Sequence, residues 1–147
     1  MRRSLLIVPL LVACAGAETP PADSAAAAAP AMLSEADVAG TWSGNIMLEA
    51  SDSVLATWTD MCSAGTCRFV SSTAPNDTVA YSYSLSGDSL MFSSAAPYRD
   101  TQAGAMVTNS GVARITANQL TGSGMVRLAE KPDSVVLRYR VTGTRQP

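Results

Sequence analysis

Two stretches of the chain alternate between apolar and polar residues with a period of two. In the stretch 78–85 the apolar positions are Val79, Tyr81, Tyr83 and Leu85. In the stretch 134–142 they are Val135, Leu137, Tyr139 and Val141. Because successive side chains of a strand point to opposite faces, this pattern predicts two strands that each bury one face.

Weaker strand patterns occupy 41–49, with Trp42, Ile46 and Leu48 on one face, and 53–61, with Val54, Ala56 and Trp58 on one face. Turn-forming residues separate the strand-like segments at 50–52, 75–77, 86–88, 117–119 and 130–133. This spacing predicts an all-β fold, an antiparallel meander of about seven to eight strands over residues 40–147. We expect the sheet to close into a small barrel, because closure removes exposed edges.

The segment before the first strand predicts one short helical turn over 35–39. Ser34 stands three residues before Asp37, which is the spacing of a helix cap with an acidic side chain in the first turn. The remaining chain, residues 34–147, has the size of one ordinary domain.

The N-terminus has the layout of a secretory signal. Arg2 and Arg3 precede an apolar run from Leu5 to Val12 and the tetrapeptide Leu11-Val12-Ala13-Cys14. This tetrapeptide resembles the bacterial lipobox, in which the cysteine after the cut carries the lipid. The resemblance implies a signal peptide at 1–13 and lipidation of Cys14. The alternatives are a cleaved signal with an incidental cysteine and a membrane-spanning helix, for which the apolar stretch falls short of about 20 residues.

Residues 14–33 are rich in Ala and Pro and predict a lipidated tether between membrane and domain. Ala15, not Asp, follows the cysteine. In the best-known sorting systems of bacterial lipoproteins, a residue other than Asp at this position implies the outer membrane, with the domain facing the periplasm. We therefore expect a cell-envelope protein held to the membrane through its lipid anchor.

The charge balance excludes some partners. The chain has 10 Lys and Arg, 12 Asp and Glu and no His. Removal of Arg2 and Arg3 with the signal would leave 8 basic against 12 acidic side chains. Such a surface lacks the basic footprint of nucleic-acid binders and is not drawn to anionic lipids, so we expect no nucleic-acid partner.

The other two cysteines, Cys62 and Cys67, form an even pair in a compartment that permits disulfides. A bond between them would close a short hairpin, with Gly65 free to take a positive φ. A zinc site would need more ligands than the chain offers. We expect a disulfide, no metal and no cofactor.

Gly40-Thr41-Trp42, which follows the short helix and begins the first strand, resembles the Gly-x-Trp signature of lipocalin-like barrels. In that family a late-strand arginine packs across the tryptophan, a role open here to Arg138, Arg140 or Arg145. The same opening is similar to that of small bacterial periplasmic protease inhibitors. The resemblance implies either a ligand-binding barrel or an inhibitor, and Trp42 can also be simply a core anchor.

Catalysis is not expected. Gly87-Asp88-Ser89-Leu90 matches the nucleophile motif of a lipase family, but it sits between two strands and no histidine is present to activate Ser89. The carboxylates Asp52, Asp77, Asp88 and Asp133 all fall in predicted turns, where aspartate is a common turn former.

The longest connection, about 93–107, contains Pro97-Tyr98-Arg99-Asp100, in which we expect Tyr98 and Arg99 to be exposed. Such a pair suits partner contact, and an ordinary surface loop is the alternative. Two functions remain open. The barrel binds a small apolar or amphipathic ligand inside, or it is an envelope-tethered interaction module or inhibitor with a packed interior. If Trp42, Tyr81, Tyr83 and Tyr139 close on one another, the interior is packed and the second function gains.

Overall fold

The structure is a computed structural model that describes residues 32–147. The proposed signal peptide, Cys14 and nearly all of the tether lie outside the described residues. Within residues 32–147, no helix has the length and apolarity needed to cross a bilayer.

One short helix precedes nine strands. The elements are α1 (Glu35–Val38), β1 (Gly40–Leu48), β2 (Val54–Ser63), β3 (Thr66–Ser71), β4 (Ala74–Ser86), β5 (Ser89–Ser94), β6 (Tyr98–Asp100), β7 (Ala105–Thr116), β8 (Gln119–Leu128) and β9 (Lys131–Arg145).

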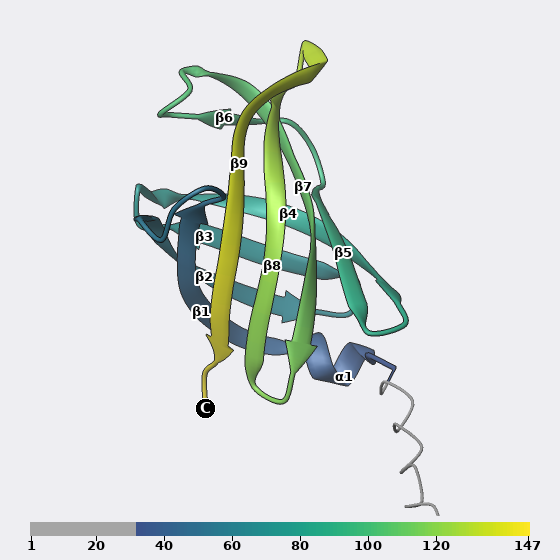
Figure 1. Ribbon diagram of the computed structural model, residues 1–147. Coiled ribbons are helices and arrows are strands. Elements are labelled where there is room, and N and C mark those ends of the chain that lie inside the picture. Colours follow the sequence, from purple (N-terminus) through teal and green to yellow (C-terminus); the bar gives the residue numbers. More distant parts are fainter. Residues whose placement is uncertain (1–31) are drawn as a thin grey trace, which may run out of the picture.

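All strand pairs are antiparallel, and each strand pairs with its neighbour in the chain except where β5 meets β7 and β9 meets β1. These two pairings close eight strands into a barrel, and β6 adds an extra strand beside the first residues of β7 (Figure 1). The prediction of an all-β meander that closes into a small barrel is confirmed. Closure leaves the interior as the one place where the inward faces of all eight strands meet.

The helical turn expected at 35–39 is present as α1, and the Asp37 carboxylate accepts a hydrogen bond from the Ser34 backbone N–H at 2.9 Å. Hydrogen bonds from Ser34 lower the pKa of Asp37. α1 lies at the end of the barrel where the β7–β8 turn and the C-terminus also lie (Figure 1). We call this the closed end.

Trp42 anchors the closed end. Its side chain is 1% exposed, and its indole N–H donates to the Val38 carbonyl oxygen at 2.8 Å. The Arg145 guanidinium lies 5.0 Å from the Trp42 ring centroid and donates to the carbonyl oxygens of Ala36 (3.3 Å) and Asp37. Among the three arginines that the sequence left open, Arg145 is therefore the one that packs across Trp42.

Two of the predicted turns are strand residues, which corrects the sequence interpretation. Pro75-Asn76-Asp77 lies within β4, but the pairing with β3 skips from Ala74 to Thr78, so these three residues bulge out of the ladder. Lys131, Pro132 and Asp133 begin β9, and the turn itself is confined to 129–130. Both prolines thus lie where a missing N–H breaks little of the ladder.

The connection 93–107 is also more ordered than its sequence indicates. Tyr98–Asp100 forms β6, and the Asp100 carboxylate accepts hydrogen bonds from the backbone N–H groups of Gln102 (2.9 Å) and Ala103 (2.7 Å). Tyr98 is half-buried, whereas Arg99 is exposed. The prediction that both side chains are exposed is wrong for Tyr98.

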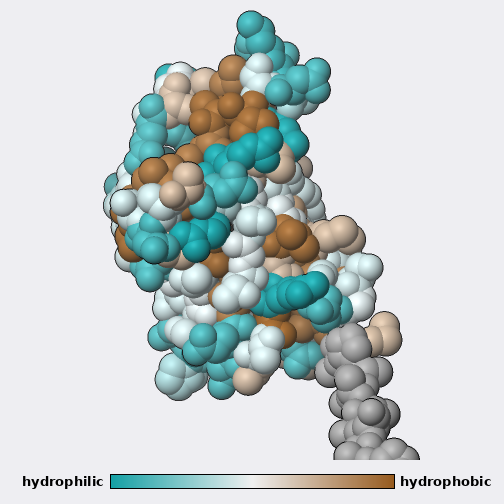
Figure 2. All heavy atoms as spheres, viewed as in Figure 1, coloured by the Kyte–Doolittle hydropathy of each residue, from teal (hydrophilic) through white to brown (hydrophobic). Residues whose placement is uncertain are grey.

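The end opposite α1, which we call the mouth, carries the β1–β2 and β8–β9 turns and β6 (Figure 1). Large apolar side chains are exposed around it, and Figure 2 shows hydrophobic atoms gathered near this end. They are Leu48, Val54, Leu55, Met106, Val135 and Val136. Val135 was expected to face inward; it is exposed because the pairing of β9 with β8 shifts register beside it.

Candidate functional site

The site lies inside the barrel and starts from three alternate residues of β2. Trp58 is buried and Asp60 and Cys62 are half-buried, whereas Thr59 and Met61 between them are exposed. The period-two geometry of a strand therefore points Asp60 into the barrel together with an indole and a sulfur.

Cys62 is bonded to Cys67, as expected, and the two residues face each other in the β2–β3 ladder. Gly65, in the turn between the strands, has a φ of 72°. The disulfide faces the barrel interior and forms part of the cavity wall. It fixes the β2–β3 hairpin next to Asp60.

An inner cavity of about 80 Å³ lies between this wall and the opposite strands. Its lining is apolar and aromatic apart from a few polar groups. The lining residues that carry the argument below are Trp58, Asp60, Phe69, Tyr81, Asn109 and Tyr139. Asp60 is the one charged side chain in this lining.

Asp60 has no partner in the described part of the chain. Its Oδ1 atom is buried without a hydrogen bond, and the ion pairs found within residues 32–147 join Arg114 to Asp88 and Arg140 to Asp52. Burial removes water from the carboxyl group and raises the pKa of Asp60 to about 7. The group can therefore carry or lose its charge near neutral pH.

Trp58 is the second unpartnered polar group. The side chain is 4% exposed, and its indole N–H has no acceptor among the described residues. The ring packs against β9, where a Cβ at Gly143 would lie 2.6 Å from Cζ2 of Trp58. A buried donor without a partner costs about 1–3 kcal/mol, so it calls for an explanation.

Aromatic rings continue from Trp58 along the cavity wall. Trp58 stacks on Phe69 at 6.5 Å, Phe69 meets Tyr81 edge to face at 5.7 Å, and Tyr81 meets Phe92 at 6.0 Å. These distances fall in the range of favourable ring pairs. The four rings give the cavity a continuous aromatic side on β2 to β5.

A polar layer crosses the barrel above this wall. Asn109 donates to the Tyr81 hydroxyl at 2.9 Å and accepts from the Tyr139 hydroxyl at 2.8 Å. Burial raises the pKa of both tyrosines, so both hydroxyls stay neutral. All three side chains are buried, and every polar atom that joins them is paired.

Beyond this layer lies a second cavity, of about 110 Å³, which we call the mouth cavity. It shares Ile46, Phe69, Asn109 and Tyr139 with the inner cavity, so the two spaces adjoin across the polar layer. The charged residues in its lining are Asp77, Arg99 and Asp100. Two carboxylates against one guanidinium make the approach to Asp60 acidic.

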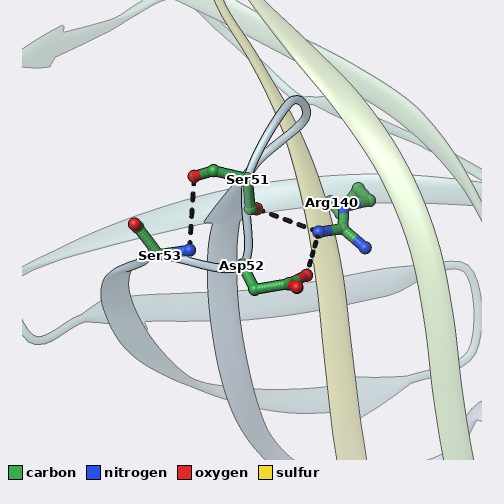
Figure 3. A network of polar contacts seen from close by, with 4 residues as sticks. All are labelled: Ser51, Asp52, Ser53 and Arg140. Carbon is green, nitrogen blue, oxygen red and sulfur yellow. Dashed lines mark hydrogen bonds and ion pairs between the residues drawn. The ribbon is translucent and has the colours of Figure 1, made fainter.

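The β1–β2 turn at the mouth is held by Arg140. Its guanidinium donates to the Ser51 carbonyl oxygen at 2.9 Å and pairs with Asp52 at 2.7 Å, and the Ser53 N–H donates to the Ser51 hydroxyl at 3.3 Å (Figure 3). Arg140 is thus occupied far from Trp42. Arg138 lines an open groove on the outer surface beside Arg127.

The other sequence candidates do not form a reactive site. Ser89 lies just after the β4–β5 turn, and its hydroxyl donates to the Asp88 carboxylate at 2.9 Å. Asp52 and Asp88 lie in turns as expected, whereas Asp77 and Asp133 are strand residues. Asp60 and the sulfurs of Cys62 and Cys67 lie within 4.8 Å of one another, but two bonded sulfurs are not thiolates and cannot act as the usual metal ligands.

The interior test posed by the sequence has a clear outcome. Trp42, Tyr81, Tyr83 and Tyr139 are all buried, but all four also line the inner cavity instead of filling it. Tyr83 belongs to the closed end, where its hydroxyl donates to the Glu35 carboxylate and lies 3.0 Å from the Ser63 carbonyl oxygen. The barrel interior is therefore hollow to a limited extent, and the cavity extends from the middle of the barrel to the side chains of Trp42 and Tyr83 at the closed end.

Sequence reasoning missed Asp60, Asn109 and the donor role of Trp58. Asp60 has the same strand parity as Trp58 and Cys62, and this parity was the available signal. Asn109 follows the connection 93–107, in a stretch for which the sequence predicts no strand pattern, so no such signal marked it. A comparison of the chain with protein-family models, curated proteins and solved structures finds no match.

Proposed function

We propose that the protein is a lipid-anchored binding protein of the bacterial cell envelope that holds a small apolar or amphipathic molecule inside its barrel, without catalysis. The observation that carries this proposal is the inner cavity, which combines an aromatic wall with two buried polar groups that lack partners. Ligand sites are typically concave and apolar with a few placed polar groups. The apolar rim of the mouth supports entry from that end.

The size of the cavity limits the ligand. A dry cavity of about 150 Å³ binds benzene, so the inner cavity alone takes a smaller group. A longer molecule would extend into the mouth cavity, which requires side chains of the Tyr81, Asn109 and Tyr139 layer to move apart. We therefore expect a slender ligand instead of a bulky ring system.

Binding is tested by titrating the purified protein with a panel of short alkyl compounds while tryptophan fluorescence is recorded. Trp58 and Trp42 line the inner cavity, so an occupant should change their emission saturably. The apolar contribution to the binding affinity should persist at high salt, because salt screens only interactions between charges. Absence of saturable binding across the panel would contradict the proposal.

The anchor is tested by replacing Cys14 with Ser in the full chain. The motif Leu11-Val12-Ala13-Cys14 supports lipidation, so the variant should move from the membrane pellet to the soluble periplasmic fraction. A Cys62→Ser variant, which keeps Cys14, serves as the control and should stay in the pellet. Unchanged fractionation of the Cys14 variant would refute the anchor.

A second candidate function is an envelope-tethered interaction module or inhibitor. It is favoured by the exposed apolar rim and by β6, which places Arg99 at the surface of the mouth. In that case the rim would meet a partner protein and the cavity would stay empty. The same titration separates the two functions, because only the first requires a fluorescence change with small ligands.

A further inference from the structure

The middle of the barrel contains an acceptor without a donor. Asp60 Oδ1 is buried, receives no hydrogen bond from the described residues and has no cationic side chain paired with it. A buried carboxylate is normally stabilised by a cation or by several donors. Residues 32–147 supply neither, so we look for the missing partner in what enters the cavity.

The surroundings of Asp60 favour a positively charged donor over a neutral one. The faces of aromatic rings attract cations, and four linked rings, from Trp58 to Phe92, form the adjoining wall. Asp77 and Asp100 add carboxylates at the mouth, where Arg99 is the only opposing charge in the lining. An anionic ligand would be repelled by the carboxylates of the mouth and of Asp60 and by the faces of the aromatic rings.

We propose that the ligand of this barrel carries a protonated amine, which pairs with Asp60 in the inner cavity while its alkyl part points toward the mouth. This inference rests on the proposed binding function and names the chemical class of its ligand. The inner cavity, at about 80 Å³, suits an ammonium group with the first carbons of its chain. The mouth cavity of about 110 Å³ takes the remainder.

The experiment compares three probes of equal chain length: hexylamine, hexan-1-ol and hexanoate. Binding to the purified protein is measured by calorimetry at pH 8, which lies above the pKa of Asp60, about 7. We expect hexylamine to bind at least about tenfold more tightly than hexan-1-ol, the effect of one charge-assisted hydrogen bond, and hexanoate to bind most weakly.

Two variants locate the effect. Asp60→Asn should weaken hexylamine binding by at least about tenfold. Its affinity for hexan-1-ol should stay within about threefold of the wild-type value. Asp133→Asn removes an exposed carboxylate that lines neither cavity and should leave both affinities unchanged. Circular dichroism establishes that each variant is folded.

A pH series on the wild type gives the same test without a variant. Hexylamine affinity should fall as the pH is lowered from 8 to 5, because Asp60 takes up a proton, while hexan-1-ol affinity stays constant. The other titratable side chains of the inner cavity are Tyr81, Tyr83 and Tyr139, whose raised pKa values keep them neutral throughout. The charged groups of the mouth lining are Asp77, Arg99 and Asp100.

The outcomes separate this inference from the proposed function. If hexylamine and hexan-1-ol bind saturably with equal affinity, and Asp60→Asn changes neither, the inference of an amine ligand is overturned and the binding function remains. Ordered water would then be the partner of Asp60. Binding of none of the three probes would overturn both. Preferred binding of hexylamine that Asp60→Asn abolishes would support both.

Discussion

The chain has two tryptophans, both buried in the barrel, and only one of them has a hydrogen-bonded indole N–H among the described residues. At the closed end, Trp42 donates to Val38 and lies under the Arg145 guanidinium. In the middle, Trp58 has no acceptor among the residues that the structure describes, and its neighbour on the same strand face, Asp60, has no donor among them. Unpaired buried groups reduce stability, and natural proteins carry such costs mainly at functional or strained sites. The paired indole of Trp42 stabilises the closed end, whereas the unpaired groups beside the inner cavity lower the stability of the middle.

Replacing Trp42 with Ala should break the closed end and have the largest effect. Loss of a buried indole costs about 3–5 kcal/mol in unfolding free energy. The hydrogen bond to Val38 and the contact with Arg145 are lost at the same time. Chemical denaturation measures the change, with Val112→Ala, an exposed truncation, as a control. A near-neutral Trp42→Ala would remove the anchor role of this residue.

The pH dependence of stability should report the unpaired state of Asp60. The folded protein keeps a proton on Asp60 up to about pH 7, whereas the unfolded chain releases it near 3.8. Between these values the folded state binds the extra proton, so stability falls as the pH rises, by as much as about 4 kcal/mol. Above pH 7 this contribution is constant.

Denaturation of the wild type and Asp60→Asn at pH 5 and pH 8 checks this expectation. The variant has no titrating carboxyl group at this position, so its free energy of unfolding should fall much less between pH 5 and pH 8. It should therefore be the more stable protein at pH 8. An identical pH profile in the two proteins would mean that Asp60 is satisfied in solution.

Reduction of the disulfide should have a smaller effect, although Cys62 and Cys67 line the cavity beside Asp60. The bond closes a short loop, and the loop-entropy estimate is about 2 kcal/mol. Denaturation with and without a reductant measures it, and a Cys62→Ser, Cys67→Ser double variant should match the reduced protein. Complete unfolding on reduction would show that the β2–β3 hairpin contributes far more than loop entropy.

The smallest effects come from a matched pair of conservative changes. Trp42→Phe removes a satisfied donor and leaves the Val38 carbonyl oxygen without it, which should cost about 1 kcal/mol beyond the change in volume. Trp58→Phe removes a donor that has no acceptor, so it loses no hydrogen bond. In thermal denaturation, Trp42→Phe should therefore have the lower melting temperature of the two variants. Equal losses would indicate that Trp58 has a partner in solution.

Much of the fold follows from local patterns. The alternation at Val79, Tyr81 and Tyr83 predicts an inward-facing strand, and all three side chains are buried or half-buried. Gly65 and the β4–β5 turn stand where their residue types predict turns. The pairing of Cys62 with Cys67 follows from their number and spacing. These features depend on neighbours in the sequence, because strand parity and turn geometry are set within a few residues.

Other features depend on how distant strands meet. Arg138, Arg140 and Arg145 are equivalent by sequence, and only the pairing of β9 with β1 brings Arg145 over Trp42. The parity of Asp60 points it inward, but its lack of a partner depends on what all the other strands place around it. The sequence by itself thus determined an antiparallel β chain with a disulfide hairpin. The tertiary structure decided the closure through β5 and β7, the packing of Arg145 across Trp42 and the unpaired carboxyl group in the middle, since each results from contacts between residues far apart in the chain.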